Sequence, residues 1–230
     1  MRLLSKFPVV LLDLNGTCMF GGDRFGVGED FYTTYCAIGG RRLSAAEVTR
    51  YVRACYEGMS RVYADPQCYE DFPSLTEGLQ RYACPPGSEL RLLEQVFTLH
   101  EVGAVPAWAA AVLRRLASTH RLALVTNIWA PKDAWLAEFE RVGLADVFRQ
   151  AVFSSDFRCI KPSPRLYHTA LHGVGARPQE ALFVGDSLRY DLAGAKQVGL
   201  ATVWITSQPR PHPSVDYRVA SLRELETLAA

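Results

Sequence analysis

The sequence predicts a doubly wound α/β fold, a Rossmann-like core built on a parallel sheet, with an all-helical cap inserted after the first strand. Three observations lead to this expectation. An apolar run over residues 8–12 leads directly into Asp13, as in a strand that is buried on both faces. From residue 106 onward, helical and strand-like segments alternate, which is typical of a parallel sheet covered by helices. Residues 28–104 carry hardly any strand pattern.

Polar residues follow the first strand, at the end where open α/β sheets bind their ligands. Asp13 and Asn15 come directly after the apolar run, and Gly16 permits a tight turn that brings the backbone close to a ligand. A carboxylate at this position can act as a nucleophile or as a metal ligand. The alternative is a buried strand that ends in an ordinary polar turn.

The inserted segment is expected to be helical from its spacing of apolar and capping residues. Ser44 and Glu47 have the spacing of a capping box and open a helix. A helical stripe over residues 65–82 is interrupted by Pro73, which breaks or kinks it. Residues 88–100 are helical again. We therefore expect this block to form an all-helical insert in the α/β core.

The second half of the core alternates regularly. Pro106 stands at the start of its first helix, and Gly143 and Gly199 stand directly after two others. We expect helices over residues 106–119, 131–142, 163–174, 191–198 and 221–228, strands over residues 122–126, 151–154, 181–184 and 201–206, and a proline-rich loop over residues 208–214. Right-handed crossovers then place the carboxyl ends of the strands along one edge of the sheet.

Composition and charge exclude several classes of protein. The formal net charge is +1, from 25 basic and 24 acidic residues, so no global field draws the protein to nucleic acid or to an anionic membrane. No apolar run approaches the roughly 20 residues of a membrane-spanning helix, and the N-terminus lacks the form of a signal peptide. The six cysteines form no CxxC pair, which favours free thiols. We expect a soluble, cytoplasmic protein.

Polar groups also follow three later strands. Thr126 and Asn127 end the second strand, Lys161 lies in the loop after the third, and Asp186 follows the fourth. If these loops meet near Asp13, the site holds a nucleophilic carboxylate, a neutral donor, a cation and a second carboxylate. This set suits attack on a phosphoryl group, with Mg²⁺ bound by carboxylates and phosphate oxygens.

Four segments in this order resemble the motifs of the haloacid dehalogenase superfamily. They are DLNGT at 13–17, VTN at 125–127, IKPSP at 160–164 and VGDSLRYDLAGAKQVG at 184–199. The resemblance covers residues 1–17 and 104–230, which it implies are the α/β core. The insert, residues 18–103, is similar in position and helical character to the helical cap of that family. Four motifs in order make chance resemblance improbable.

The resemblance implies a role for each of these residues. Asp13 would be the nucleophile that forms a covalent intermediate, and Lys161 would offset its charge and that of the substrate. Thr126 and Asn127 would hold the phosphoryl oxygens, next to the backbone turn at Gly16.

The resemblance also implies a metal site. Mg²⁺ would be bound by Asp13, by Asp186 and by the backbone carbonyl of Asn15. Asp191 would support the loop or the second shell of the metal. The substrate would be a small phosphorylated molecule, and the sequence does not reveal the oligomeric state.

Asn15 departs from the family pattern. Phosphatases of this family usually have aspartate at this position, where it protonates the leaving alkoxide and later activates water. Asparagine cannot exchange a proton near neutral pH, and the expected cost is of the order of 10²–10⁴-fold in rate. The alternatives are a 2-haloacid dehalogenase, a phosphonatase-like hydrolase or a non-catalytic phosphate-binding relative. Asp186 favours phosphate chemistry, so we expect a Mg²⁺-dependent phosphatase.

Two further features have simpler explanations. His168 and His172 are spaced to chelate a metal on one helix, but they lack a third ligand, and a solvated helix face explains them. Trp129 could line the site or pack in the core, and the sequence leaves both open.

Overall fold

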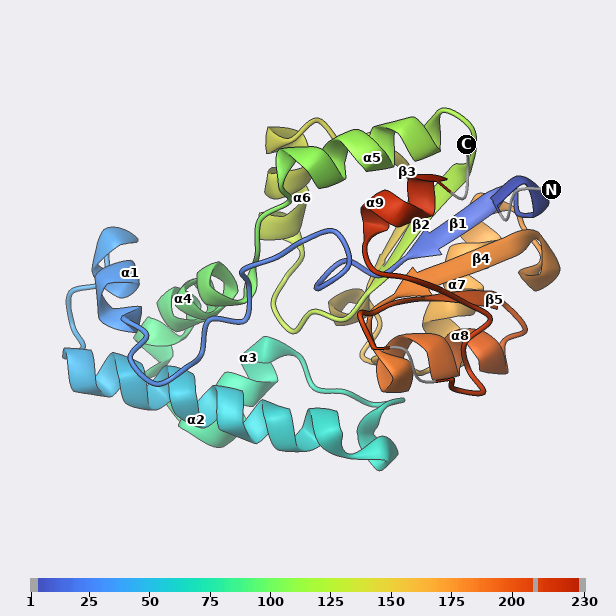
Figure 1. Ribbon diagram of the computed structural model, residues 1–230. Helices are drawn as coiled ribbons and strands as arrows, with labels where there is room; N and C mark the ends of the chain where they lie inside the picture. Colours follow the sequence, from blue (N-terminus) through green and yellow to red (C-terminus); the bar gives the residue numbers. More distant parts are fainter. Residues whose placement is uncertain (1–3, 209–210, 228–230) are drawn as a thin grey trace.

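A parallel sheet forms the centre of the structure, a computed structural model that describes residues 4–208 and 211–227 (Figure 1). Within these residues the sheet has six strands in the order β3-β2-β1-β4-β5-β6, and every neighbouring pair is parallel. The strands are β1 (Val9–Leu12), β2 (Arg121–Thr126), β3 (Phe148–Phe153), β4 (Ala181–Gly185), β5 (Ala201–Ile205) and β6 (Tyr217–Val219). The predicted doubly wound α/β fold is confirmed.

The position of β1 follows from its sequence. All four of its residues are buried. Val10 and Leu12 belong to one apolar core, and Val9 and Leu11 belong to a second core on the other face of the sheet. A strand that is apolar on both faces is stable only between two layers, and β1 accordingly lies between β2 and β4.

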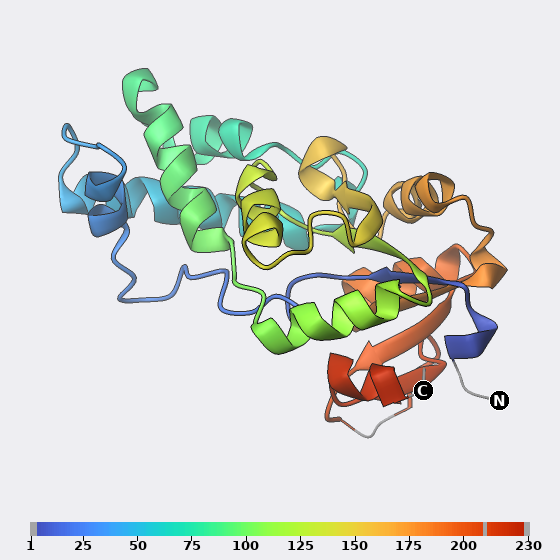
Figure 2. The ribbon, with the colours of Figure 1, turned by 90° about the horizontal axis from the view of Figure 1, so that it is seen from above.

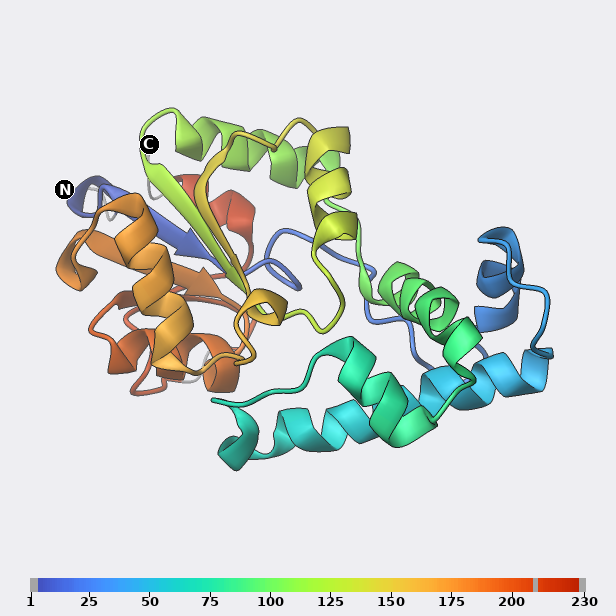
Figure 3. The same ribbon diagram turned by 180° about the vertical axis from the view of Figure 1, so that it is seen from behind.

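Helices cover both faces of the sheet, as the alternating pattern predicts. The core that contains Leu12 also takes side chains from α5 (Ala107–Ala117), α6 (Asp133–Arg141) and α9 (Leu222–Thr227). The opposite core takes side chains from α7 (Pro164–Val174) and α8 (Ala193–Gln197), and α7 lies over the face seen in Figure 3. Each face therefore has its own helical layer.

The inserted segment forms a separate group of helices beyond the carboxyl ends of the strands (Figures 1 and 2). It contains α1 (Phe31–Ala37), α2 (Ala45–Ala64), α3 (Leu75–Gly78) and α4 (Leu90–Glu101). Where the chain leaves and re-enters the core, the Phe20 and Ala104 backbones exchange hydrogen bonds of 2.9 and 2.8 Å. The exact domain limits at residues 17 and 104 stay a prediction.

Several elements differ from the sequence prediction. The structure adds α1 and β6, which have seven and three residues and are too short for a periodic pattern to develop. Pro73 lies between a single 3₁₀ turn, Pro66–Cys68, and α3, so the expected stripe is broken. The helix expected from Asp191 begins earlier, with a π-helical turn at Leu188–Leu192.

The capping residues that mark a helix start were more reliable than the predicted lengths of the elements. The Ser44–Glu47 capping box is present, with a Ser44 N–H to Glu47 Oε2 distance of 2.8 Å. Residues 209–210 of the expected loop and residue 228 of the expected last helix lie outside the described residues. In the part of the chain that the structure describes, no helix combines the length and apolar character needed to cross a bilayer.

Candidate active site

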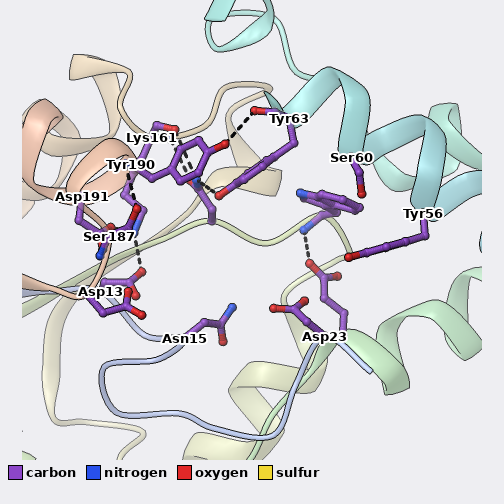
Figure 4. A pocket seen from close by; sticks show the side chains of 14 residues that line it. Asp13, Asn15, Asp23, Tyr56, Ser60, Tyr63, Lys161, Ser187, Tyr190 and Asp191 are labelled. Carbon is purple, nitrogen blue, oxygen red and sulfur yellow. Dashed lines mark hydrogen bonds and ion pairs between the residues drawn. The ribbon is translucent and has the colours of Figure 1, made fainter. Parts of the chain in front are cut away.

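The carboxyl ends of the central strands open into a cavity of about 290 Å³ between the sheet and the inserted helices (Figure 4). The core supplies one side of its wall: Asp13, Asn15, Asn127, Trp129, Lys161, Asp186, Ser187, Tyr190 and Asp191. The insert and its two connections supply the other side: Asp23, Tyr56, Ser60, Tyr63 and Glu101. The predicted convergence of four loops near Asp13 is therefore present in the structure.

Lys161 bridges two buried carboxylates. Its Nζ lies 2.5 Å from Asp13 Oδ1 and 2.6 Å from Asp191 Oδ1. All three side chains are buried, and Asp191 Oδ2 also accepts a 2.9 Å hydrogen bond from the Ser187 N–H. Burial lowers the pKa of Lys161, but the two carboxylates outweigh it and raise the pKa overall. The lysine therefore stays charged and fixes both acids.

A third carboxylate completes an acidic group. One oxygen each of Asp13, Asp186 and Asp191 lies within 4.8 Å of the others. Burial and the charge of Asp191 raise the pKa of Asp13 to about 7 despite Lys161, and the same two causes raise the pKa of Asp186 to about 6. Carboxylates that repel one another in this way suit a divalent cation with oxygen ligands, such as Mg²⁺.

Gly16 is required by the position of Asp186. A Cβ at residue 16 would lie 2.2 Å from Asp186 Oδ2, and the backbone φ of +78° belongs to the left-handed region that favours glycine. The turn after Asp13 is therefore shaped around a carboxylate from another strand. Asn15, also in this turn, is half-buried and lines the cavity.

Thr126 and Asn127 have different environments. The Thr126 hydroxyl is fully buried, has no hydrogen-bond partner among the described residues, and does not line the cavity. Asn127 accepts a 2.8 Å hydrogen bond from the Lys161 N–H and donates one of 2.9 Å to the Tyr63 hydroxyl. Asn127 thus positions the lysine loop. Binding of phosphoryl oxygens by either residue stays a prediction.

No sequence motif assigns a role to the residues on the insert side of the cavity. Tyr56, Ser60 and Tyr63 share one face of α2 at intervals of four and three residues, a spacing that could have drawn attention to them. No spacing pattern marks Glu101, because its hydrogen-bond partners, Trp129 and Ala130, lie far from it along the chain. Its carboxylate accepts hydrogen bonds of 2.6 Å from the Trp129 N–H and 2.9 Å from the Ala130 N–H.

Contacts between the insert and the core close the cavity. Arg189 donates to the Tyr69 hydroxyl at 2.8 Å and to the Ala64 carbonyl at 2.6 Å. The Phe72 N–H donates to the Arg158 carbonyl at 2.8 Å. These bonds hold the C-terminal end of α2 and the segment after it against the loops that carry the candidate catalytic groups.

The histidine pair and Trp129, singled out from the sequence, have clear positions. His168 and His172 are exposed on α7, in agreement with a solvated helix face. Trp129 both lines the cavity and packs on Phe72 and Phe97, at centroid distances of 6.0 Å.

Known proteins are similar to parts of this chain. A family model described as haloacid dehalogenase-like hydrolase matches residues 96–205. The phosphoserine phosphatase of Thermus thermophilus is 37% identical over 107 residues, 45% of this chain and 42% of the relative. The pyrimidine 5′-nucleotidase YjjG of Escherichia coli is 30% identical over 124 residues, 52% of this chain and 54% of the relative. The chain thus spans about half the length of the curated relatives that it matches.

Solved structures match over nearly the whole chain. A phosphatase from Thermococcus onnurineus superimposes with a TM-score of 0.65 at 24% identity, covering 97% of this chain and 98% of that one. A 2-haloacid dehalogenase from Pseudomonas syringae gives a TM-score of 0.66 at 23% identity with the same coverage. At these identities the two structures establish a shared fold.

Proposed function

Since the chain belongs to the haloacid dehalogenase-like hydrolase family, we propose that it is a Mg²⁺-dependent phosphatase of a small phosphate ester. The reaction would pass through an aspartyl-phosphate on Asp13. The observation that supports this most strongly is the acidic group of Asp13, Asp186 and Asp191 with Lys161 bonded between two of its members. Clustered carboxylates suit a phosphoryl group that arrives together with a cation, because the cation supplies positive charge that Lys161, already bonded to two of them, does not supply alone.

The residues present fit Mg²⁺. Asp13, Asp186 and the backbone carbonyl of Asn15 would bind it, with Asp191 holding Lys161 and the loop in place. When bound, the ion neutralises negative charge on the carboxylates and on the phosphoryl oxygens. By the resemblance, the Thr126 hydroxyl, which has no partner among the described residues, would donate to one of those oxygens.

The chemical steps can be assigned to atoms of this chain. A carboxylate oxygen of Asp13 forms a bond to phosphorus, and the bond from phosphorus to the alcohol oxygen breaks, leaving its electron pair on that oxygen. The alcohol oxygen must then gain a proton, which Asn15 cannot supply, so the proton comes from water. A second water attacks the phosphorus of the aspartyl-phosphate and gives a proton to the hydroxide left by the first water. The bond from phosphorus to the Asp13 oxygen breaks, which releases phosphate and restores the Asp13 carboxylate.

The charge of the cavity disfavours the dehalogenase alternative. A 2-haloacid carries a carboxylate that needs a cationic partner. Within the described part of the chain, the cavity wall holds five carboxylates and, as its one lysine or arginine, Lys161. Lys161 is already bonded to Asp13 and Asp191. A cytoplasmic location, and the lack of nucleic-acid or membrane partners, stay predictions from the sequence.

Phosphate release and halide release test the proposal. The panel consists of p-nitrophenyl phosphate, other phosphate esters and 2-haloacids, each with Mg²⁺ or a chelator. We expect phosphate release that needs both Mg²⁺ and Asp13, no release by Asp13→Asn, and faster release by Asn15→Asp. Halide release without metal would contradict the phosphatase assignment. Phosphate binding without turnover by either route would favour a non-catalytic relative.

A further inference from the structure

We propose that the alcohol part of the substrate carries an ammonium group, which binds between aromatic rings and two carboxylates at the insert side of the cavity. The proposal takes from the proposed function only the position of the phosphoryl group, next to Asp13 and Lys161. The aromatic wall is defined here as Tyr56, Tyr63, Trp129 and Tyr190. The acidic end is defined as Asp23 and Glu101.

The aromatic wall is continuous and crosses the cavity from the phosphoryl side to the acidic end. Tyr190 and Tyr63 lie 4.5 Å apart between ring centroids, Tyr63 and Trp129 lie 5.7 Å apart, and Trp129 and Tyr56 lie 5.8 Å apart. All four rings line the cavity. The Tyr56 hydroxyl points into the cavity from α2 (Figure 4). Rings arranged around a cavity in this way bind ammonium groups through their electron-rich faces.

The acidic end stands where the two connections to the insert meet. The Asp23 N–H donates a 3.0 Å hydrogen bond to the Glu101 carbonyl, so the two residues are held side by side. Figure 4 shows Asp23 on the far side of Asn15 from Asp13. The acidic end is therefore separate from the group that would bind Mg²⁺, and it faces a different part of the substrate.

No cation of the described chain balances the acidic end within the cavity. Lys161, the lysine of the cavity wall, is bonded to Asp13 and Asp191. Glu101 is only 4% exposed, and burial raises the pKa of its carboxyl to about 8. A carboxylate buried without a counter-charge is costly. An ammonium group of the substrate would supply that charge and favour loss of the Glu101 proton, while a carboxylate of the substrate would meet two acidic side chains and no cation.

Calorimetric binding of matched phosphate esters tests the proposal. The probes are phosphocholine and 3,3-dimethylbutyl phosphate, which have the same shape but differ in one positive charge. Binding is measured with a chelator present, so that no turnover occurs. We expect phosphocholine to bind about tenfold more tightly than its neutral counterpart, and phosphoglycolate to bind more weakly than either.

The chain offers well-matched variants. Asp23 has a backbone φ of +53°, a conformation that asparagine also tolerates, so Asp23→Asn removes the charge without new strain. This variant should lower the preference for phosphocholine about threefold or more. Glu57→Gln, an exposed residue next to Tyr56 that does not line the cavity, should leave it unchanged. Tyr56→Leu should reduce the preference and Tyr56→Phe should retain it.

Several outcomes would overturn the inference. They are equal or tighter binding of 3,3-dimethylbutyl phosphate, of phosphoglycolate or of glycerol 3-phosphate, no detectable binding of phosphocholine, and a preference that Asp23→Asn leaves unchanged. Failure of the proposed function would look different. It would be a lack of Mg²⁺-dependent phosphate release from p-nitrophenyl phosphate, which carries no ammonium group, whatever the binding preference.

Discussion

Lys161 lies between two buried carboxylates, those of Asp13 and Asp191, and its ammonium group pairs with both. Removing one partner of a buried ion pair costs about 3–5 kcal/mol, because the remaining charge is left unpaired. We expect Lys161→Met to lower the free energy of unfolding in urea by about this amount. Adding Asp191→Asn should recover part of the loss. If the losses in unfolding free energy of the two single variants simply add in the double variant, Lys161 and Asp191 are not coupled and the prediction is wrong.

Gly16 offers a direct test of the contact between the first and fourth strand ends. We expect Gly16→Ala to weaken Mg²⁺ binding at least about tenfold, because the new Cβ displaces the Asp186 carboxylate. Isothermal titration with Mg²⁺ measures this. Gly21→Ala is the matched control, since Gly21 has a similar φ of +73° but nothing within 4 Å of the added Cβ. Equal loss of Mg²⁺ affinity in both variants would mean that backbone strain, and not Asp186, is responsible.

Glu101 makes stability depend on pH. Burial raises the pKa of its carboxyl from 4.5 to about 8. Between these values the folded protein keeps a proton that the unfolded chain has lost, so stability falls as pH rises through this window. Glu101→Gln should remove a decline of roughly a few kcal/mol between about pH 5 and pH 8. Urea unfolding of both proteins across this range measures the difference in slope. Parallel curves would contradict the assignment.

At the scale of elements, Arg189 joins the π-helical turn after β4 to the end of α2. We expect Arg189→Ala to loosen this closure and to accelerate amide hydrogen exchange in residues 64–72 by about 3–10-fold, as for loss of a local contact. Arg177→Ala is the control, because Arg177 pairs with Glu180 on the surface, three residues away. Equal exchange in the two variants would show that Arg189 does not hold the insert in place.

The core elements could be predicted because each carries a local signal. The strand β1 is a continuous apolar run, and helices α5 and α7 have proline at or directly before their first residue. The short β6 was missed, because it depends on its pairing with β5 and not on a pattern of its own. Likewise, no local rule predicts a π-helical turn at Leu188–Leu192.

Some residues of the candidate site could likewise be predicted from the sequence, and others could not. Asp13, Lys161 and Asp186 stand at strand ends or in strand-end loops, where parallel topology alone brings side chains together. Asp23 and Glu101 enter the cavity only because the connections to the insert are paired with each other, which spacing along the chain does not encode. Asp191 was given a supporting role, and the structure adds that it bonds Lys161 directly.

At the scale of the whole molecule, the two parts of the chain contribute different halves of one cavity. The sheet edge supplies the acidic group and its lysine, while the insert supplies most of the wall that faces them. One apolar cluster runs through both parts and includes Leu12 of β1, Val48 of α2 and Phe97 of α4. The insert therefore packs on the core as a continuous body that covers the candidate nucleophile.

Because Asn15 stands where phosphatases of this family usually have an acid, we expect the two steps of the reaction to differ in rate. The p-nitrophenolate ion needs no proton in order to leave, so the first step can proceed without a general acid. Hydrolysis of the aspartyl-phosphate then lacks a general base and should be slower by the order of 10²–10⁴-fold than in an enzyme that has one. The phosphorylated protein should accumulate.

The most direct test is to quench the protein with acid during turnover of p-nitrophenyl phosphate and Mg²⁺, and to weigh the peptide that contains Asp13. We predict an initial burst of about one p-nitrophenolate per protein molecule, together with an Asp13 peptide heavier by one phosphoryl group. Asn15→Asp should lose the burst and turn over faster. An unmodified Asp13 peptide during turnover, or undiminished turnover by Asp13→Asn, would contradict Asp13 as the nucleophile.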